Sequence, residues 1–205
     1  MTSQKLMFFG FCSVFTVIIL FCVLAGGYTS FWRSKNRIEG SKSLLTDACQ
    51  KRLDLVPDLI EITPKNNPQN PLQQIDQTAQ KAAKILPHVI SQHTPLEKAL
   101  IKDFEISQLQ LTTQLKEVFI QLEASLDKKQ SGQFSDIKNQ FYSAQNNLFV
   151  AGQRYNDEVN YFNIRKEAFW TSFIANLFGF NKLNYINIST DLFLPAKVTF
   201  AKNNS

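Results

Sequence analysis

The sequence predicts an all-α protein: an N-terminal transmembrane helix, an antiparallel bundle of about four long helices, and an extended C-terminal tail. One observation is an uncharged apolar stretch at the N-terminus, and another is the recurrence of apolar residues every three or four positions afterwards. A third is the count of 7 glycines and 7 prolines in 205 residues, few for an all-β chain with many tight turns. The expected segments are 1–5 (N-terminal end), 6–28 (anchor), 29–179 (bundle) and 180–205 (tail).

The N-terminal anchor is the clearest signal. No charged residue occurs between Leu6 and Trp32, and a helix needs about 20 apolar residues to cross the hydrocarbon core of a bilayer. A cleaved signal peptide has a shorter apolar centre of roughly 7 to 15 residues, although Val23-Leu24-Ala25 would serve as a cleavage site. We interpret 6–28 as an uncleaved single span whose partner is the lipid bilayer, with a signal peptide as the alternative.

Charged residues around the span predict its orientation. Lys5 precedes the span, and four basic residues follow it: Arg33, Lys35, Arg37 and Lys42. Because basic residues accumulate on the cytoplasmic side, the C-terminal domain is predicted to be cytoplasmic, with the periplasm as the alternative. Residues 43–205 contain 17 basic and 16 acidic side chains, which argues against nucleic-acid binding, since that requires a clustered basic face.

Two helical segments are predicted in the first half of the domain. One surrounds Leu53, the other covers 72–92, and the loop Thr63–Pro71, with three prolines and three asparagines, separates them. Pro87 lies inside the second segment and is expected to bend or break it, because proline lacks the backbone N–H that a helix needs.

Two longer helices are predicted in the second half. Thr94-Pro95-Leu96-Glu97 is typical of a helix start, with threonine as the cap and proline in the first helical position. The tract KKQSGQ is expected to end that helix, with Gly132 as the turn residue. Apolar residues at steps of three or four from Ile137 to Phe162 predict a final helix of about 40 residues that stops at Gly179.

Two polar rows at helical spacing lie beside apolar stripes. The acidic row consists of Asp54, Asp58 and Glu61, and the asparagine row consists of Asn156, Asn160 and Asn163 with Arg154 nearby. Asparagine is a poor helix former, so its repetition near a core face indicates hydrogen bonds between helices. We expect the two rows to meet across a helix interface as a structural seam. A partner-binding surface is the first alternative and catalysis the second.

The sequence predicts no catalytic, cofactor or metal site. A di-metal site in a helical bundle requires Glu-x-x-His on two helices, but isoleucine stands three residues before both histidines, His88 and His93. The chain has no Gly-x-Ser-x-Gly, no glycine-rich phosphate loop and no His-Glu-x-x-His. Cys49 lies on the apolar side of its helix and is expected to be a buried, unreactive thiol.

Four ordered sequence blocks carry a resemblance to a known family. They are KRLDLVPDLIE, RYNDEVNYFN, FIANLFGF and PAKVTF. On these blocks the chain from Tyr28 to Phe200 resembles the LemA family. The resemblance implies a membrane-anchored bundle of long antiparallel helices in a bacterial cell, and it brings no catalytic residues. Pro57 belongs to the first block, so a kink is expected there, with the carbonyl of Leu53 freed to find another donor.

The chain departs from the family pattern in a charged cluster. Members usually carry a Thr-Glu-Asn-Arg run and an Ala-Arg pair ahead of the asparagine row. This chain has the neutral residues Gln145, Asn147 and Gly152 at the charged positions. Trp170 also stands where a proline is usual. Functions that the family draws from that cluster are therefore not carried over to this chain.

These observations favour a non-enzymatic, membrane-anchored interaction or scaffold protein of the bacterial inner membrane. The alternative is an accessory or regulatory subunit of a membrane protease or transporter, and a catalyst ranks third. The sequence does not identify the protein partner, and it leaves assembly into a homo-oligomer open.

Overall fold

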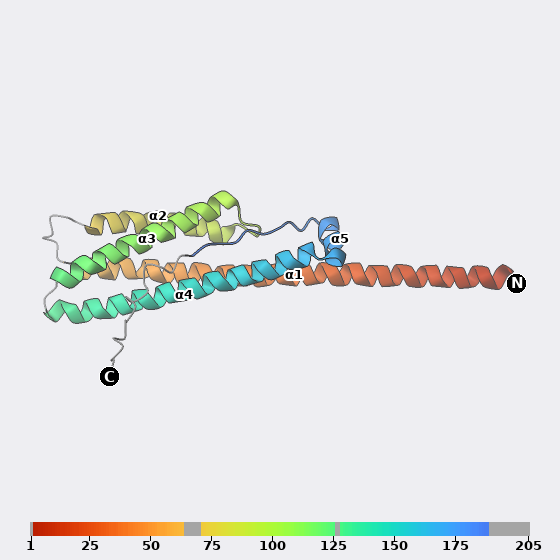
Figure 1. Ribbon diagram of the computed structural model, residues 1–205, viewed down its shortest axis with the longest axis horizontal. Helices are drawn as coiled ribbons and strands as arrows, with labels where there is room; N and C mark the ends of the chain where they lie inside the picture. Colours follow the sequence, from red (N-terminus) through yellow and green to blue (C-terminus); the bar gives the residue numbers. More distant parts are fainter. Residues whose placement is uncertain (1, 64–70, 126–127, 189–205) are drawn as a thin grey trace, which may run out of the picture.

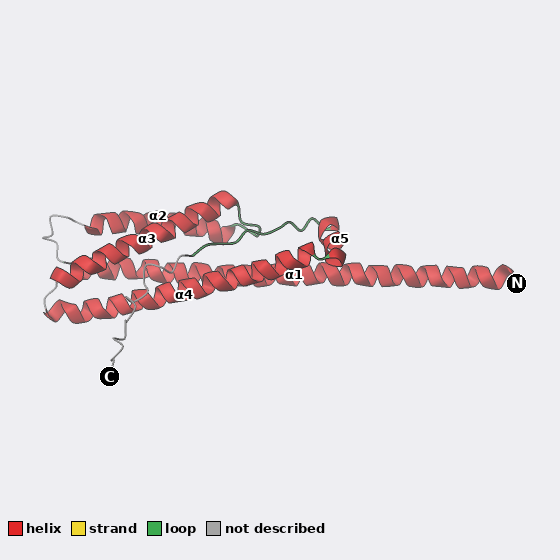
Figure 2. Cartoon of the chain, viewed as in Figure 1, coloured by secondary structure: helices red, strands yellow, loops and turns green. Residues whose placement is uncertain are grey.

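The computed structural model describes residues 2–63, 71–125 and 128–188, and within them every regular element is an α-helix (Figure 2). The helices are α1 (Thr2–Ile62), α2 (Pro71–Ser91), α3 (Lys98–Ser125), α4 (Lys128–Glu167) and α5 (Phe169–Leu177). The predicted all-α fold class is confirmed.

The helices form an up-and-down bundle with one long projection. The N-terminal part of α1 extends alone from the bundle, while its C-terminal part packs with α2, α3 and α4 (Figure 1). The consecutive long helices α1 to α4 run in alternating directions, and the most extensive pairings are α1 with α4 and α2 with α3. The short α5 lies beside α1, at the end of the bundle from which the projection leaves.

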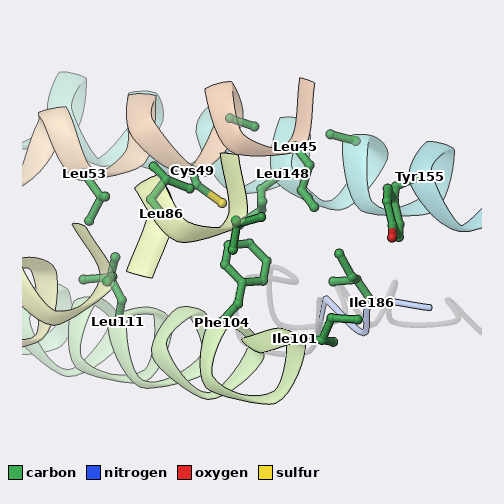
Figure 3. Close-up of a cluster of buried hydrophobic side chains, with 14 of the residues drawn as sticks. Leu45, Cys49, Leu53, Leu86, Ile101, Phe104, Leu111, Leu148, Tyr155 and Ile186 are labelled. Carbon is green, nitrogen blue, oxygen red and sulfur yellow. The ribbon is translucent and has the colours of Figure 1, made fainter. Parts of the chain in front are cut away.

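The apolar stripes of the four long helices face one another in the core. Figure 3 shows the middle of this core, with Leu45, Cys49, Leu53, Leu86, Ile101, Phe104, Leu111, Leu148, Tyr155 and Ile186. Burial of one such side chain stabilises the fold by about 1.5–3 kcal/mol. The predicted burial of Cys49 is confirmed, and burial raises the pKa of its thiol to about 12, which keeps it protonated and unreactive.

Gly132, Pro87 and Pro57 do not end the helices in which they lie, and the bends expected at the two prolines stay predictions. Gly132 was expected in a turn, but it lies inside α4, which begins at Lys128 because the lysines and glutamines of this tract are good helix formers. Pro87 does not break α2, which continues to Ser91. Pro57 likewise lies inside an unbroken α1. The carbonyl that it leaves without its helical donor belongs to Leu53.

The predicted start of α3 was wrong. Thr94 does not cap this helix, which begins only at Lys98. Instead the backbone N–H and the hydroxyl of Thr94 both donate to Oε1 of Glu39 on α1, at 2.7 and 2.8 Å. The carboxylate of Glu39 thus accepts from both donors of Thr94. These two bonds fasten the connection between α2 and α3 to α1.

The predicted final helix is divided in two. Ala168 has extended backbone angles and separates α4 from α5. The predicted stop is confirmed, since Gly179 follows the end of α5 with a φ of 70°, a conformation that glycine adopts without strain. Residues 180–188 then return along α4 without regular structure, with Leu183 and Ile186 buried. The rest of the predicted tail, with the PAKVTF block, lies outside the described residues.

Candidate functional site

The acidic row and the asparagine row do not meet, contrary to the prediction. The antiparallel register of α1 and α4 places Arg37 against Glu158 and Arg52 against Gln145. Asn156 therefore lies level with about residue 40 of α1, some 14 residues from Asp54. At 1.5 Å per residue this separation is about 20 Å.

The three side chains of the acidic row are exposed on the part of α1 farthest from the projection. Asp54 accepts a hydrogen bond from Gln50 of the same helix at 2.7 Å. Asp58 and Glu61 line a groove of about 440 Å³ with Asp136 of α4. We call this the acidic groove.

The asparagine row holds the C-terminal segment 180–188 against α4. The amide of Asn163 donates to the carbonyl of Leu183 at 3.0 Å and accepts from its N–H at 2.9 Å. The amide of Asn156 does the same with Ile186, at 2.6 and 2.9 Å. Asn160, which is exposed, accepts from the hydroxyl of Tyr185 at 3.1 Å. Asn156 and Asn163 thus pair with backbone as a neighbouring β-strand would.

The side chain of Arg154 is exposed, and it forms no hydrogen bond with residues 180–188. The prediction of an interhelical seam therefore identified asparagines that form structural hydrogen bonds, but it assigned them the wrong partner. The partner is an irregular segment 20 to 30 positions later in the chain, and no local pattern in α4 points to it.

Arg52 is a buried cation that the sequence analysis missed. It is 1% exposed, and its guanidinium donates to Oγ1 of Thr112, Oε1 of Gln145, and both the carbonyl and side-chain oxygens of Gln108. Among the described residues no carboxylate lies within ion-pair distance of it. Burial lowers its pKa to about 10, so it remains protonated at neutral pH.

The signal for Arg52 was present in the sequence. It occupies a core position of the α1 stripe Leu45, Cys49, Arg52, Val56 and Leu59, where the steps alternate between four and three. The Nε of Arg52 and the Nε2 of Gln108 are buried without an acceptor, and both residues line a cavity of about 190 Å³. Because the guanidinium of Arg52 bonds to side chains of both α3 and α4, we assign this group a structural role between α1, α3 and α4.

The membrane-facing candidate is the projecting part of α1 with α5. Within the described residues, α1 is the one helix long and apolar enough to cross a membrane by length and composition. Its large apolar side chains from Met7 to Val23 are exposed. Further along, Leu24 is partly buried and Phe31 is fully buried in the bundle core. One helix therefore passes from the exposed apolar stretch into the bundle without interruption.

Aromatic rings join α1, α4 and the residues that follow α5 where the projection begins. The ring of Tyr28 lies 4.9 Å from that of Phe178, and the ring of Phe31 lies 5.5 Å from Phe162 and 5.0 Å from Phe180, measured between centroids. We call these five rings the aromatic cluster. They fix α5 and the start of the C-terminal segment on α1.

One basic side chain lies against the aromatic cluster, and two others on α1 form ion pairs. The guanidinium of Arg165 lies 5.1 Å from the ring centroid of Phe31, and Arg37 pairs with Glu158 at 2.9 Å. Lys42 is one of the four basic residues that follow the span, but its side chain is buried. Its Nζ donates to the carbonyl of Gln92 and pairs with Glu39, each at 2.7 Å.

The family model of the LemA family matches residues 42–200. This range is more than half of the chain. The protein belongs to the LemA family. Comparison with curated proteins and with solved structures gives no match. The matched range begins inside the bundle part of α1, so the apolar projection lies outside it.

Gln145 and Gly152, two of the departures from the usual LemA pattern, occupy structural positions. Gln145 is buried and accepts from Arg52, whereas Asn147 is exposed. Gly152 is buried, and a Cβ there would come within 2.8 Å of Cγ1 of Ile188. A larger residue at 152 would therefore displace the C-terminal segment from α4.

The described part of this LemA chain contains no group of three or more His, Cys, Asp or Glu side chains placed to hold a metal ion. Both histidines are exposed, and Nδ1 of His88 lies 2.9 Å from the carbonyl of Lys84 in its own helix.

Proposed function

We propose that this LemA-family protein is a non-enzymatic scaffold, anchored in the bacterial inner membrane by residues 6–28, that presents a helical bundle to a protein partner. The observation that carries the proposal is the continuity of α1, which forms both the apolar projection and one wall of the bundle. With no flexible linker between them, the bundle is held at a fixed height above the bilayer.

The distance involved is substantial. Residues 28–62 of α1 span about 50 Å at 1.5 Å per residue. The acidic groove at the far end of α1 would therefore lie tens of ångströms from the membrane surface. A rigid helical spacer of this kind suits a protein that places a contact surface at a defined height.

The buried polar groups support a non-enzymatic role. Arg52 bonds to α3 and α4, and Asn156 and Asn163 bond to the C-terminal segment. Each of these groups connects structural elements, and a thiol protonated by burial, Cys49, offers no nucleophile. A purified full-length protein in detergent that turned over a substrate would overturn this part of the proposal.

The acidic groove is the proposed contact surface for the partner. Asp58, Glu61 and Asp136 bring three carboxylates to one exposed groove, with Ile62 and Ile137 at its wall. Negative charge beside apolar surface suits a partner segment with basic and apolar side chains. The exposed position of the acidic row is what favours a binding role over a structural seam.

Site-specific photo-crosslinking in native membranes tests the partner. A photoreactive residue at Asp58 should capture a discrete protein, whereas one at the exposed Glu117 of α3 should not. Equal capture at both positions would contradict the proposal. A captured membrane protease or transporter subunit would favour the accessory-subunit alternative.

Anchoring and orientation have their own tests. The full-length protein should resist alkaline extraction and keep its N-terminal residues, and a C-terminal reporter should be active on the cytoplasmic side. A mature N-terminus near Gly26 would contradict the anchor. A reporter active only in the periplasm would contradict the orientation while leaving the anchor intact.

A further inference from the structure

The short helix α5 presents its largest apolar side chains outward. Phe169 is 80% exposed, Trp170 82%, Phe173 66% and Leu177 57%. At about 100° per residue these four side chains fall within one stripe roughly 100° wide. On the opposite side, Ile174 and Ala175 are buried. The exposed face therefore has no covering element among the described residues, and it is rich in aromatic rings.

The position of α5 along α1 indicates what covers this face. A Cβ on Gly27 would lie within 2.5 Å of Cδ1 of Ile174, so α1 and α5 are in close contact at this level. Tyr28, the last residue of the proposed span, packs on Phe178 directly after α5. The exposed aromatic stripe thus lies where the proposed span leaves the hydrocarbon core.

The charge around α5 is complementary to an anionic lipid surface. Residues 27–37 and 160–185 together contain six basic and one acidic side chain. The basic ones are Arg33, Lys35, Arg37, Arg165, Lys166 and Lys182. Arg37 pairs with Glu158 and Lys182 pairs with Glu167, so the cationic surface consists of the other four. Cationic side chains close to a membrane are attracted by anionic headgroups, and aromatic rings favour the same interfacial layer.

We propose that α5 is an interfacial helix that inserts Phe169, Trp170 and Phe173 between lipid headgroups beside the span. Large exposed apolar patches mark interaction sites, and an amphipathic helix at this level meets lipid first. The inference rests on the proposed anchor. Its consequence is a second attachment point, which fixes the tilt of the bundle relative to the bilayer.

The two tryptophans of the chain allow a direct test in full-length protein reconstituted into bilayers that contain lipids brominated near the headgroup end of the acyl chain. The Trp32→Phe variant leaves Trp170 as the single fluorophore and reports on α5. The Trp170→Phe variant leaves Trp32, four residues beyond the proposed span, and reports on the anchor. We expect both to be quenched relative to bilayers of unbrominated lipid.

A matched control uses an exposed apolar position far from α5. Ile120 on α3 is 59% exposed, and Ile120→Trp in a chain without the two native tryptophans should be unquenched. Quenching of Trp32 without quenching of Trp170 would overturn the proposal for α5 and leave the anchor standing. Failure of quenching at both would contradict the anchor itself. Trp170 shielded from an aqueous quencher but untouched by brominated lipid would mean that a protein, or a second copy, covers α5 instead.

Discussion

Two regions of α1 reverse the usual distribution of polar and apolar side chains, in opposite senses. At its N-terminal end, apolar side chains from Met7 to Val23 are exposed over the whole circumference of the helix. Near its C-terminal end, the cation of Arg52 is buried in the core. Both reversals occur in one continuous helix.

The difference shows two ways in which a misplaced side chain is accommodated. The apolar stretch would need apolar surroundings, and under the proposed anchor a bilayer would supply them to every residue of the stretch at once. Arg52 requires particular acceptors at particular positions, and three residues of α3 and α4 supply them. The placement of the apolar stretch therefore depends on a whole segment, whereas the placement of Arg52 depends on how particular side chains pack around it.

The largest expected effect concerns the apolar stretch. The double substitution Val17→Arg and Leu20→Arg places two cations near the middle of the proposed span. Each costs about 2.5–3.5 kcal/mol on insertion, hence roughly 5–7 kcal/mol together. The protein should therefore leave the membrane fraction after ultracentrifugation of alkaline-treated membranes.

A control for that experiment places the same charge on the bundle. Ile120→Arg also puts a cation on an exposed apolar position, but outside the span, and this variant should stay in the membrane fraction. If both variants behaved alike, the exposed apolar stretch would have no special role in attachment.

The second prediction concerns the buried cation. Arg52→Ala leaves the acceptors on Thr112, Gln108 and Gln145 without their donor and opens a cavity, which should lower the free energy of unfolding by on the order of 3 kcal/mol. Denaturant unfolding of the full-length protein in detergent, followed by circular dichroism, measures the loss. Arg154→Ala on the exposed face of α4 should change stability by no more than about 0.5 kcal/mol. Equal effects of the two substitutions would mean that Arg52 is not held in the core.

The third prediction separates two members of the asparagine row. Asn163 is buried and makes two hydrogen bonds to the backbone of Leu183, whereas Asn160 is exposed and bonds only to a side chain. Asn163→Ala should cost about 1–3 kcal/mol because it leaves a buried N–H and carbonyl unpaired. Hydrogen exchange of residues 180–188 should accelerate in that variant. Asn160→Ala should leave the exchange of this segment near the wild-type rate, and similar acceleration in both would contradict the assigned roles.

These cases also show how far the sequence alone could predict the structure. The apolar stretch and the stripes of the long helices are periodic or continuous signals, so the all-α class, the stop at Gly179 and the burial of Cys49 were predictable. The pairing of Glu39 with Thr94 joins residues 55 positions apart. The pairing of Asn163 with Leu183 depends on a break at Ala168 that turns the chain back. Such contacts depend on tertiary register, which no local pattern contains.

The break at Ala168 illustrates the limit most clearly. The apolar periodicity of α4 continues into α5, so the sequence predicts one helix to Phe178. The chain instead turns at Ala168, and Ile174 packs on Gly27 of α1. The absence of a side chain at position 27 permits that contact. The packing of α5 on α1 therefore depends both on Gly27 and on the helix break at Ala168, which lies 141 residues later in the chain.

The smallest expected effect is a pH dependence at Glu39. Burial alone favours the neutral form of this carboxyl group, but hydrogen bonds from Lys42 and from the N–H and hydroxyl of Thr94 outweigh it, so its pKa lies below the ordinary value of 4.5. Because the folded state binds this proton less readily than the unfolded state, the stabilisation is fully present above pH 4.5 and is lost as the pH falls through the folded pKa. Glu39→Gln should therefore give a flatter dependence of unfolding free energy on pH in the acidic range, measured by denaturant titrations in steps of pH. Thr94→Ala, which removes one of the donors, should give an intermediate slope. A slope in Glu39→Gln equal to that of the wild type would show that this carboxylate does not hold the connection between α2 and α3 to α1.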